Sequence, residues 1–362
     1  MINIGIIGAG RSGWELHAGP LQSIDGYRVT AICDSAPARL ALVARAFQVK
    51  TYAEPASLIN DPDVQVVVVA VPNHQHAVYT IAALEAGKHV ICEKPMATTL
   101  AEADAMLAAA GRCGRLLLVF HNRHWDSDYQ MVKQTVRQGL LGELMTVESR
   151  IMTYGPEWLT FGVPEFRPSW RVEAAYGGGF LNDWGAHVLE QLLDLTEEWP
   201  ASVTCHLRRG VWATETDDYF DMKLCMPSGL LVTVIGTNDA RLPLPRWFVV
   251  GREGTLLADG AWGNWGDIRI RATIGGTITD LTPQAAGPTS AARSMEVSDA
   301  LSAHFYADLR EVLATGRRAE VPVTRARDAI AIMDAARRSA AIGQAVAPAQ
   351  PRGDYREFRP RA

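Results

Sequence analysis

Residues 2–13, which read INIGIIGAGRSG, decide the fold that we expect for this chain. The apolar run Ile2–Ile7 predicts a short buried strand. Three glycines follow it at the spacing Gly-x-Gly-x-x-Gly, which allows a tight turn, the close approach of a pyrophosphate, and packing of a helix against the strand. Free N–H groups at the start of that helix favour a bound phosphate. The pattern therefore predicts a dinucleotide site, whose residues in this turn are Gly8, Gly10, Arg11, Ser12 and Gly13.

An acidic residue after the second predicted strand indicates which dinucleotide is bound. Asp34 follows the β-rich run Tyr27–Cys33 and lies 21 positions after Gly13 (34 − 13), close to the spacing of about 20 expected for an acid on the adenosine ribose. Its carboxylate would accept hydrogen bonds from the ribose hydroxyls and repel a 2′-phosphate. Ser35 follows it rather than an arginine, so we expect NAD, with Arg39 keeping NADP as the alternative.

The rest of the first third alternates strand and helix patterns. Val64–Val71 is almost continuous valine, as in a central parallel strand covered on both faces. Strands alternating with helices of about 10–15 residues predict βαβ units and a parallel sheet. We therefore expect an α/β domain of the Rossmann type over residues 1–121. Its other predicted segments are the helices Pro37–Phe47, Ala77–Ala86 and Leu100–Ala110 and the strands Lys88–Cys92 and Leu116–Phe120.

The pattern changes after residue 121. Tyr154–Gly179 is rich in aromatic residues and lacks a clear period, which is typical of a functional lid. Four β-rich runs between residues 203 and 250 predict a meander of antiparallel strands, and Gly275–Asp299 is predicted to be a loop. We expect a second domain over residues 122–345 and a tail over residues 346–362. The other predicted segments are the helices Asp126–Gln138, Leu181–Thr196, Leu301–Thr315 and Arg325–Ile342 and the strand Leu144–Met152.

The composition excludes several classes of protein. Hydrophobic residues make up 48% and charged residues 21%, as in folded globular proteins. The 35 Lys and Arg against 40 Asp and Glu give a net charge of −5, which argues against nucleic-acid binding. No apolar run reaches the ~18 residues of a membrane-spanning helix, and Met1–Gly8 lacks the charged start of a signal peptide, so we expect a cytoplasmic protein without membrane contact. The five cysteines have no CxxC spacing and predict neither disulfides nor a thiolate metal site.

Polar residues follow two predicted strands at their carboxyl ends, the edge at which open α/β sheets bind ligands. The valine strand leads into the segment VPNHQH (71–76), and the next strand leads into Glu93-Lys94-Pro95. Alternatives are open for both: Asn73 is a good helix N-cap, and a lone lysine is more often a surface residue. The candidates for cofactor binding at this edge are Val71, Pro72, Asn73, His76, Glu93 and Lys94.

A second constellation lies in the segment GGGFLNDWGAH (177–187). If a helix begins near Trp184, Asp183 and His187 share one side of it. The alternatives are an N-cap aspartate and a packed histidine. A histidine near a helix N-terminus stays neutral, as a general base must, and Asp183 could orient it or bind a substrate hydroxyl. Lys94, beside the cationic ring of an oxidised nicotinamide, should have a lowered pKa and could polarise the reacting oxygen or relay its proton.

These motifs together resemble the glucose–fructose oxidoreductase / inositol dehydrogenase / rhizopine catabolism (Gfo/Idh/MocA) family. The resemblance implies a Rossmann domain and a second α+β domain, whose open, mainly antiparallel sheet often forms the oligomer interface. It also implies Lys94, Asp183 and His187 as the catalytic residues, and a cis peptide before Pro95. The segment HNRHWDSD (121–128) resembles a subgroup that includes scyllo-inositol dehydrogenases. That subgroup commonly uses NADP, whereas Asp34 indicates NAD.

Several residues are candidates for substrate binding. Arg123 suits substrate hydroxyls, and the aromatic stretch offers ring faces with polar tips, as sugars require; a packed lid without substrate contact is the alternative. His121, His124 and Asp126 are spaced too loosely for a metal site, so we expect none. The candidates for substrate binding are Arg123, Trp125, Tyr154, Trp170, Arg171 and Tyr176.

The resemblance implies an NAD-dependent oxidoreductase that transfers a hydride between nicotinamide and a secondary alcohol of a sugar, glycoside or cyclitol. One alternative is a glycosidase or lyase that oxidises its substrate transiently with bound NAD and shows no net redox change. Another is a nucleotide-sensing or partner-binding protein without turnover. The expected partners are a small sugar or cyclitol and further copies of the chain, as a homodimer or homotetramer.

Overall fold

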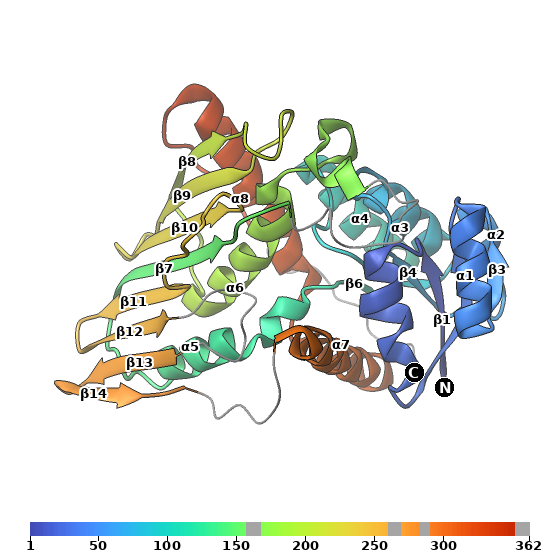
Figure 1. Cartoon of the computed structure of the whole chain (residues 1–362), viewed down its shortest axis with the longest axis horizontal. Coiled ribbons are helices and arrows are strands. Elements are labelled where there is room, and N and C mark those ends of the chain that lie inside the picture. Colours follow the sequence, from blue (N-terminus) through green and yellow to red (C-terminus); the bar gives the residue numbers. More distant parts are fainter. Residues whose placement is uncertain (157–167, 260–268, 283–289, 352–362) are drawn as a thin grey trace.

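The computed structural model describes residues 1–156, 168–259, 269–282 and 290–351. Two sheets, each flanked by helices, lie side by side in this part of the chain (Figure 1). The first has six strands in the order β3-β2-β1-β4-β5-β6, and the second has eight in the order β14-β13-β12-β11-β7-β10-β9-β8. The expected combination of a parallel Rossmann-type sheet with a mixed, mostly antiparallel sheet is confirmed.

The first sheet is parallel throughout, because each strand is followed by a helical crossover. The valine strand β4 (Val66–Val69) is fully buried, as expected for a strand covered on both faces. The short strand β3 (Lys50–Tyr52) was not predicted, because its three residues at the sheet edge lack a hydrophobic run. The other elements are β1 (Ile2–Ile7), β2 (Tyr27–Cys33), α1 (Pro37–Phe47), α2 (Pro55–Ile59), α3 (His76–Glu85), β5 (His89–Cys92), α4 (Leu100–Cys113) and β6 (Leu117–Val119).

The second sheet buries one face against helices. Along β7 (Leu144–Met152) buried and partly exposed residues alternate, as in a strand with one covered face. The helices α5, α6 and α8 lie between this sheet and the first one (Figure 1). These helices are α5 (Ser127–Arg137), α6 (Ala186–Thr196) and α8 (Val323–Ile342), and the other strands are β8 (Ser202–Arg208), β9 (Tyr219–Cys225), β10 (Leu231–Thr237), β11 (Trp247–Gly251), β12 (Gly254–Asp259), β13 (Arg269–Ile274) and β14 (Thr277–Asp280).

Two predictions for this sheet were wrong. The strands do not form a simple meander, because β7 lies between β10 and β11 and pairs with β10 in parallel. Gly275–Asp299 is not a loop throughout: it contains β14 and the first part of α7 (Ser290–Thr315). All four residues of β14 are exposed, including Ile278, so this edge strand carries no burial pattern that the sequence could display.

Helix α7 returns to the first sheet, although it follows the second sheet in the chain. Phe305, Tyr306 and Leu309 are buried in a hydrophobic cluster with Ile4 and Ile6 of β1. Part of the range 122–345 therefore packs across the predicted boundary at residue 121.

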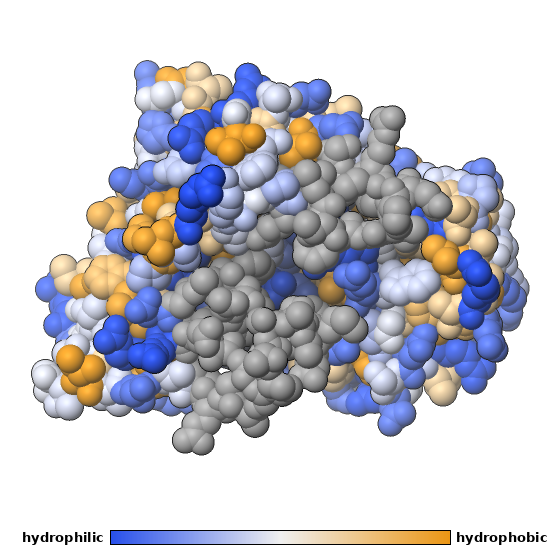
Figure 2. Space-filling model, viewed as in Figure 1, coloured by the Kyte–Doolittle hydropathy of each residue, from blue (hydrophilic) through white to orange (hydrophobic). Residues whose placement is uncertain are grey.

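The predicted tail begins as part of the fold. Val346 pairs with Val203 of β8 in an antiparallel bridge, whereas residues 352–362 lie outside the described part. Polar side chains separate small apolar patches on the face seen in Figure 2. Among the described helices, none has the length and apolar character needed to cross a membrane.

Candidate active site

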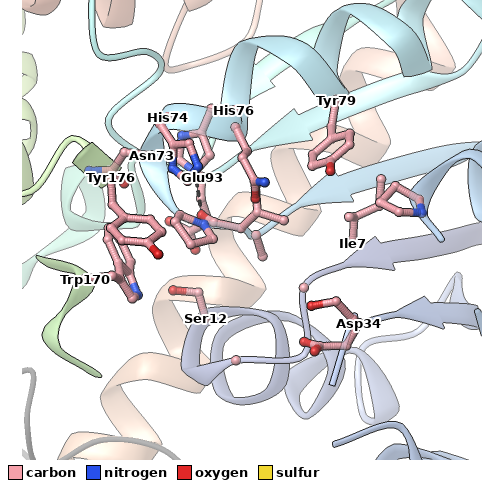
Figure 3. A pocket seen from close by; sticks show the side chains of 18 of the residues that line it. Ile7, Ser12, Asp34, Asn73, His74, His76, Tyr79, Glu93, Trp170 and Tyr176 are labelled. Atoms are coloured by element: carbon pink, nitrogen blue, oxygen red, sulfur yellow. Dashed lines mark hydrogen bonds between the residues drawn. The ribbon is translucent and has the colours of Figure 1, made fainter. Parts of the chain in front are cut away.

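The glycine turn after β1 forms one end of a pocket of about 400 Å³ (Figure 3). Gly8 has a φ of +100°, and a Cβ there would lie 2.2 Å from the carbonyl oxygen of Ala70. A Cβ on Gly13 would lie 1.8 Å from the carbonyl oxygen of Gly8. Only glycine fits at either position, since real Cβ contacts are never this short. Gly8, Gly10, Arg11 and Ser12 line the pocket, so the turn presents the backbone cradle that a dinucleotide diphosphate requires.

Asp34 lies at the same end of the pocket and is nearly buried. Its Oδ2 accepts hydrogen bonds from the Ala9 N–H (2.8 Å) and from Nη1 of Arg39 (2.8 Å), and its Oδ1 accepts one from the Ala36 N–H (2.8 Å). The carboxylate thus holds the turn and the arginine together. Arg39, because of which NADP was the alternative cofactor, forms an ion pair with Asp34, the acid that favours NAD.

The segment after β4 is fastened to both halves of the site. The two ring nitrogens of His76 contact the carbonyl oxygens of Pro95 (2.7 Å) and Val71 (2.9 Å), which joins the ends of two neighbouring strands. Asn73 is not a helix cap: its Nδ2 donates to the carbonyl oxygen of Gly177 (2.8 Å). The segment therefore links the nucleotide end of the pocket to the segment that precedes α6.

Lys94 and Asp183, 89 positions apart in the chain, form a close ion pair on the pocket wall. Nζ of Lys94 donates to Oδ1 of Asp183 (2.5 Å) and to its carbonyl oxygen (2.8 Å). Burial lowers the pKa of the Lys94 amine, with Arg171 adding to the effect. Burial alone would raise the pKa of Asp183, but Lys94 and Arg171 hold it below its ordinary value. The peptide bond between Lys94 and Pro95 is cis, as the family resemblance implied.

His187 is buried next to this pair at the start of α6. Its ring contacts those of Trp184 and His121, with centroids 5.7 Å and 5.6 Å away. Burial lowers its pKa well below the ordinary value, and the positive charge of Lys94 lowers it further. A neutral imidazole was predicted, but the main cause is burial. Helical turns over Leu181–Gly185 lead directly into α6, so the predicted helix Leu181–Thr196 is confirmed and contains both Asp183 and His187.

The candidates for substrate binding fall into two groups. Trp170, Arg171 and Tyr176 line the pocket with Lys94 and Asp183, and the guanidinium carbon of Arg171 lies 4.3 Å from the centroid of the Trp170 ring. Figure 3 shows Trp170 and Tyr176 at the end of the pocket opposite Asp34.

The other three candidates lie elsewhere. Arg123 is partly buried, with its guanidinium carbon 5.9 Å from the centroid of the Trp184 ring. Nε1 of Trp125 donates to Glu320 (3.1 Å), so this side chain packs towards α7. Tyr154 is 45% exposed and stacks on Arg241 beside the second sheet. None of these three residues is among those that line the pocket.

Two members of the histidine–aspartate set that could suggest a metal, His124 and Asp126, contact charged side chains instead. Nδ1 of His124 contacts Glu190 (3.1 Å), and Asp126 pairs with Arg123 (3.4 Å) and Arg246 (3.3 Å). Across the described ranges, no group of three His, Cys, Asp or Glu residues is placed to hold a metal ion.

A buried network behind Glu93 was missed by the sequence analysis. Nε2 of His17 contacts Oε1 of Glu93 (3.2 Å), and Nδ1 of His17 contacts the hydroxyl of Tyr306 in α7 (2.7 Å). Oε2 of Glu93 accepts the backbone N–H of Lys94 (3.2 Å). His17 lies in an apolar stretch and carries no motif, and the position of Tyr306 depends on the return of α7. His121, which the sequence suggested only as a metal ligand, is a further buried residue near the site that no motif indicated as part of it.

Comparisons with known proteins agree with this geometry. Residues 2–121 match a family model described as "Oxidoreductase family, NAD-binding Rossmann fold", and residues 129–257 match the GFO/IDH/MocA C-terminal domain. The chain is 33% identical to the uncharacterized oxidoreductase YdgJ of Escherichia coli, covering 72% of this chain and 71% of that protein. It is 32% identical to the scyllo-inositol 2-dehydrogenase (NADP(+)) IolW of Bacillus subtilis, covering 72% and 69%.

A solved structure extends the similarity over nearly the whole chain. The NAD-binding protein from Listeria innocua superposes with a TM-score of 0.80 at 27% identity, covering 96% of this chain and 97% of that one. Both family models match in the expected order along the sequence, and together they cover more than half of it. The chain belongs to the Gfo/Idh/MocA family of oxidoreductases and carries that family's NAD-binding Rossmann domain.

Proposed function

We propose that this protein is an NAD-dependent dehydrogenase that acts on a secondary alcohol of a sugar, glycoside or cyclitol. The observation that carries the proposal is the ion pair of Lys94 and Asp183, which lines the pocket that begins at the glycine turn, together with the buried ring of His187, which lies close enough to Lys94 for that charge to lower its pKa. Alcohol oxidation requires a base that takes up the hydroxyl proton, and a nearby ammonium held by a carboxylate can stabilise the charge on the reacting oxygen. The name of the relative from Bacillus subtilis, a scyllo-inositol dehydrogenase, supports a cyclitol or sugar as substrate.

The residues present fit a bound dinucleotide. In this proposal the glycine turn with Arg11 and Ser12 holds the diphosphate and Asp34 holds the adenosine ribose, since both lie at one end of the pocket. Val71, Pro72, Asn73, His76 and Glu93 complete the cofactor site towards Lys94. NAD supplies the hydride acceptor when it is bound.

In this proposal, residues of the chain accept the hydroxyl proton and stabilise the reacting oxygen. His187, neutral because it is buried, accepts the hydroxyl proton on a ring nitrogen. The Lys94 ammonium donates a hydrogen bond to the reacting oxygen and stabilises the charge that develops there. Asp183 orients Lys94 through the 2.5 Å contact and keeps the amine charged. In the reverse direction His187 returns the proton to the oxygen.

Trp170, Arg171 and Tyr176 are proposed to contact the substrate, because they line the pocket at the end opposite Asp34. Arg123 lies outside this lining but beside Trp184, whose ring contacts that of His187, and it is proposed to contact the substrate there. The structure gives Trp125 and Tyr154 no such position, so we do not assign them a substrate contact.

A substrate screen tests the proposal. Purified protein is incubated with cyclitols, aldoses and glycosides and with NAD or NADP, and both the absorbance of reduced nicotinamide and the products are recorded. We expect reduced NAD to accumulate with at least one polyol. Product without reduced nicotinamide would identify the glycosidase or lyase alternative. Cofactor binding without any conversion would contradict the proposal and favour a sensing role.

We also propose that the protein works as a homodimer or homotetramer. The uncovered face of the second sheet carries large apolar side chains, including Met145 (49% exposed) and Leu231 (52% exposed). Light scattering during size-exclusion chromatography measures the assembly, and a monomer at all concentrations would contradict this part of the proposal.

A further inference from the structure

One buried polar side chain beside the proposed base has no structural role that its contacts explain. His121 follows β6 and is only 1% exposed. Neither of its ring nitrogens has a hydrogen-bond partner within the described residues. A buried polar group without a partner costs free energy, and such groups in native proteins call for a functional explanation.

The position of His121 connects it to the active site by two routes. Strand β6 pairs with β5, so His121 and Lys94 follow neighbouring strands at the same edge of the sheet. Its ring also meets that of His187 edge to face, with centroids 5.6 Å apart. Nδ1 of His187 likewise has no partner among the residues described. Two imidazoles with unused nitrogens therefore lie in contact next to the Lys94–Asp183 pair.

The chemistry of this histidine pair matches a hydroxylated ligand. A neutral imidazole has one nitrogen that donates and one that accepts, and a hydroxyl can do both. Burial lowers the pKa of His121 to about 4, with Lys94 adding to the effect, so the ring is neutral. His124, three positions on, is as deeply buried, but its Nδ1 contacts Glu190 (3.1 Å) and its Nε2 contacts Lys133 (3.4 Å). The ring nitrogens without hydrogen-bond partners are therefore those of His121 and not those of His124.

We infer that His121 is a further substrate-binding residue, which holds the hydroxyl adjacent to the one that His187 deprotonates. This inference rests on the proposed function and narrows it. The substrate class is a vicinal diol, with a free hydroxyl on a carbon next to the carbon that is oxidised. A cyclitol or an unsubstituted sugar ring meets this requirement, and a ring that is deoxygenated or substituted at that carbon does not.

The test compares substrates with and without the adjacent hydroxyl. The probes are scyllo-inositol with cis-1,3,5-cyclohexanetriol, its trideoxy analogue without any adjacent pair of hydroxyls, and trans-1,2-cyclohexanediol with cyclohexanol, its deoxy analogue, each assayed with NAD for kcat and KM. We expect wild-type protein to prefer the parent by ~10- to 100-fold in kcat/KM, as for the loss of a buried hydrogen bond. In His121→Phe we expect the kcat/KM of the parent to fall towards that of the deoxy analogue, mainly because KM rises. The preference for the parent should shrink to about 2-fold or less. His121→Asn, which keeps a donor and an acceptor, restores part of it.

Thermal unfolding separates this role from a structural one. His121→Phe replaces an unpartnered polar ring by an apolar one, so we expect an unchanged or higher Tm. The matched control is His124→Asn, which removes contacts to Glu190 and Lys133; its Tm should fall while its preference for the parent remains. A wild-type preference retained by His121→Phe would overturn the inference. So would a large loss of Tm in that variant without a change in preference.

Equilibrium binding keeps the inference separate from the proposed function. Calorimetry of the NAD-loaded protein measures the Kd of the same probes without turnover. If no probe is oxidised but His121→Phe abolishes a preference for the parent in binding, the proposed dehydrogenase activity fails and the inference stands. Equal Kd values for parent and deoxy analogue in the wild-type protein would overturn the inference even where oxidation is observed.

Discussion

The two ends of the pocket are built in different ways. The nucleotide end is formed by one continuous turn, where glycines bring backbone into place and Asp34 fastens it through hydrogen bonds of 2.8 Å. The other end, at which we propose catalysis, is formed by side chains from two segments far apart in the sequence, where Lys94 after β5 meets Asp183 and His187 of the segment 177–187. Local geometry thus makes the proposed cofactor site, whereas long-range packing makes the proposed catalytic site.

We expect the largest effect from a substitution that removes a proposed catalytic side chain and leaves the proposed cofactor site unchanged. Lys94→Met removes the ammonium that polarises the reacting oxygen but keeps a similar side-chain volume. We expect kcat to fall ~10³-fold, within the range for loss of an acid–base group, while the Kd of NAD measured by calorimetry changes little. His187→Asn serves as a second variant with the same expectation. A loss of NAD binding equal to the loss of kcat would show that the two ends are not separable.

The second prediction uses acid to compare two buried histidines, one within the first sheet and one at its proposed catalytic edge. Burial lowers the pKa of His89 in the first sheet and of His121 at the catalytic end, each to about 4. Because both pKa values are depressed, folding favours the neutral rings, and this stabilisation is complete above pH ~6.5 and is lost as the pH falls towards about 4. Each histidine contributes at most about 3 kcal/mol at the acid limit.

Denaturant unfolding at neutral and at mildly acidic pH measures this effect. His121→Phe should reduce the pH dependence of the free energy of unfolding relative to the wild-type protein, and His89 should account for part of what remains. An identical pH dependence in the variant would contradict a buried neutral histidine at the catalytic end.

The third prediction concerns cofactor choice at the nucleotide end. Asp34→Ala removes the carboxylate proposed to bind the ribose and releases Arg39 from its ion pair. We expect the Kd of NAD to rise ~10- to 100-fold and the preference for NAD over NADP to shrink or reverse. Asp34→Asn is the matched control, since it removes the charge and retains an acceptor oxygen. Unchanged Kd values for both cofactors in Asp34→Ala would remove Asp34 from the site.

The smallest effect tests the buried network of His17, Glu93 and Tyr306. Tyr306→Phe removes the hydroxyl that contacts buried His17 and leaves Nδ1 of that ring without its partner. We expect the free energy of unfolding to fall by about 1–3 kcal/mol and kcat to change only a few-fold. Tyr27→Phe, which removes a hydroxyl that donates to the backbone of Tyr306, is the control for stability alone. A fall in kcat as large as that of Lys94→Met would make this network part of the catalytic machinery.

The nucleotide end was largely predictable because its signals are local. Strand β1, the glycine turn, β2 and Asp34 lie within 34 consecutive residues, and β1 and β2 have the predicted bounds. A short turn has few conformations open to it, so residue type and spacing are enough. For the catalytic end, Lys94 and Asp183 were named from motifs, but the 2.5 Å contact between them depends on how the two halves pack.

The remaining features depend on long-range burial, and the linear pattern does not encode them. The order of residues indicated a parallel sheet, a glycine cradle and an acid at its end, since each follows from the steric and hydrogen-bonding demands of neighbouring residues. Three-dimensional packing placed β7 between β10 and β11, returned α7 to the first sheet, and directed Trp125 away from the pocket. In each of these cases the partner lies far along the chain, and the free energy that selects it is spread over many buried contacts instead of one recognisable motif.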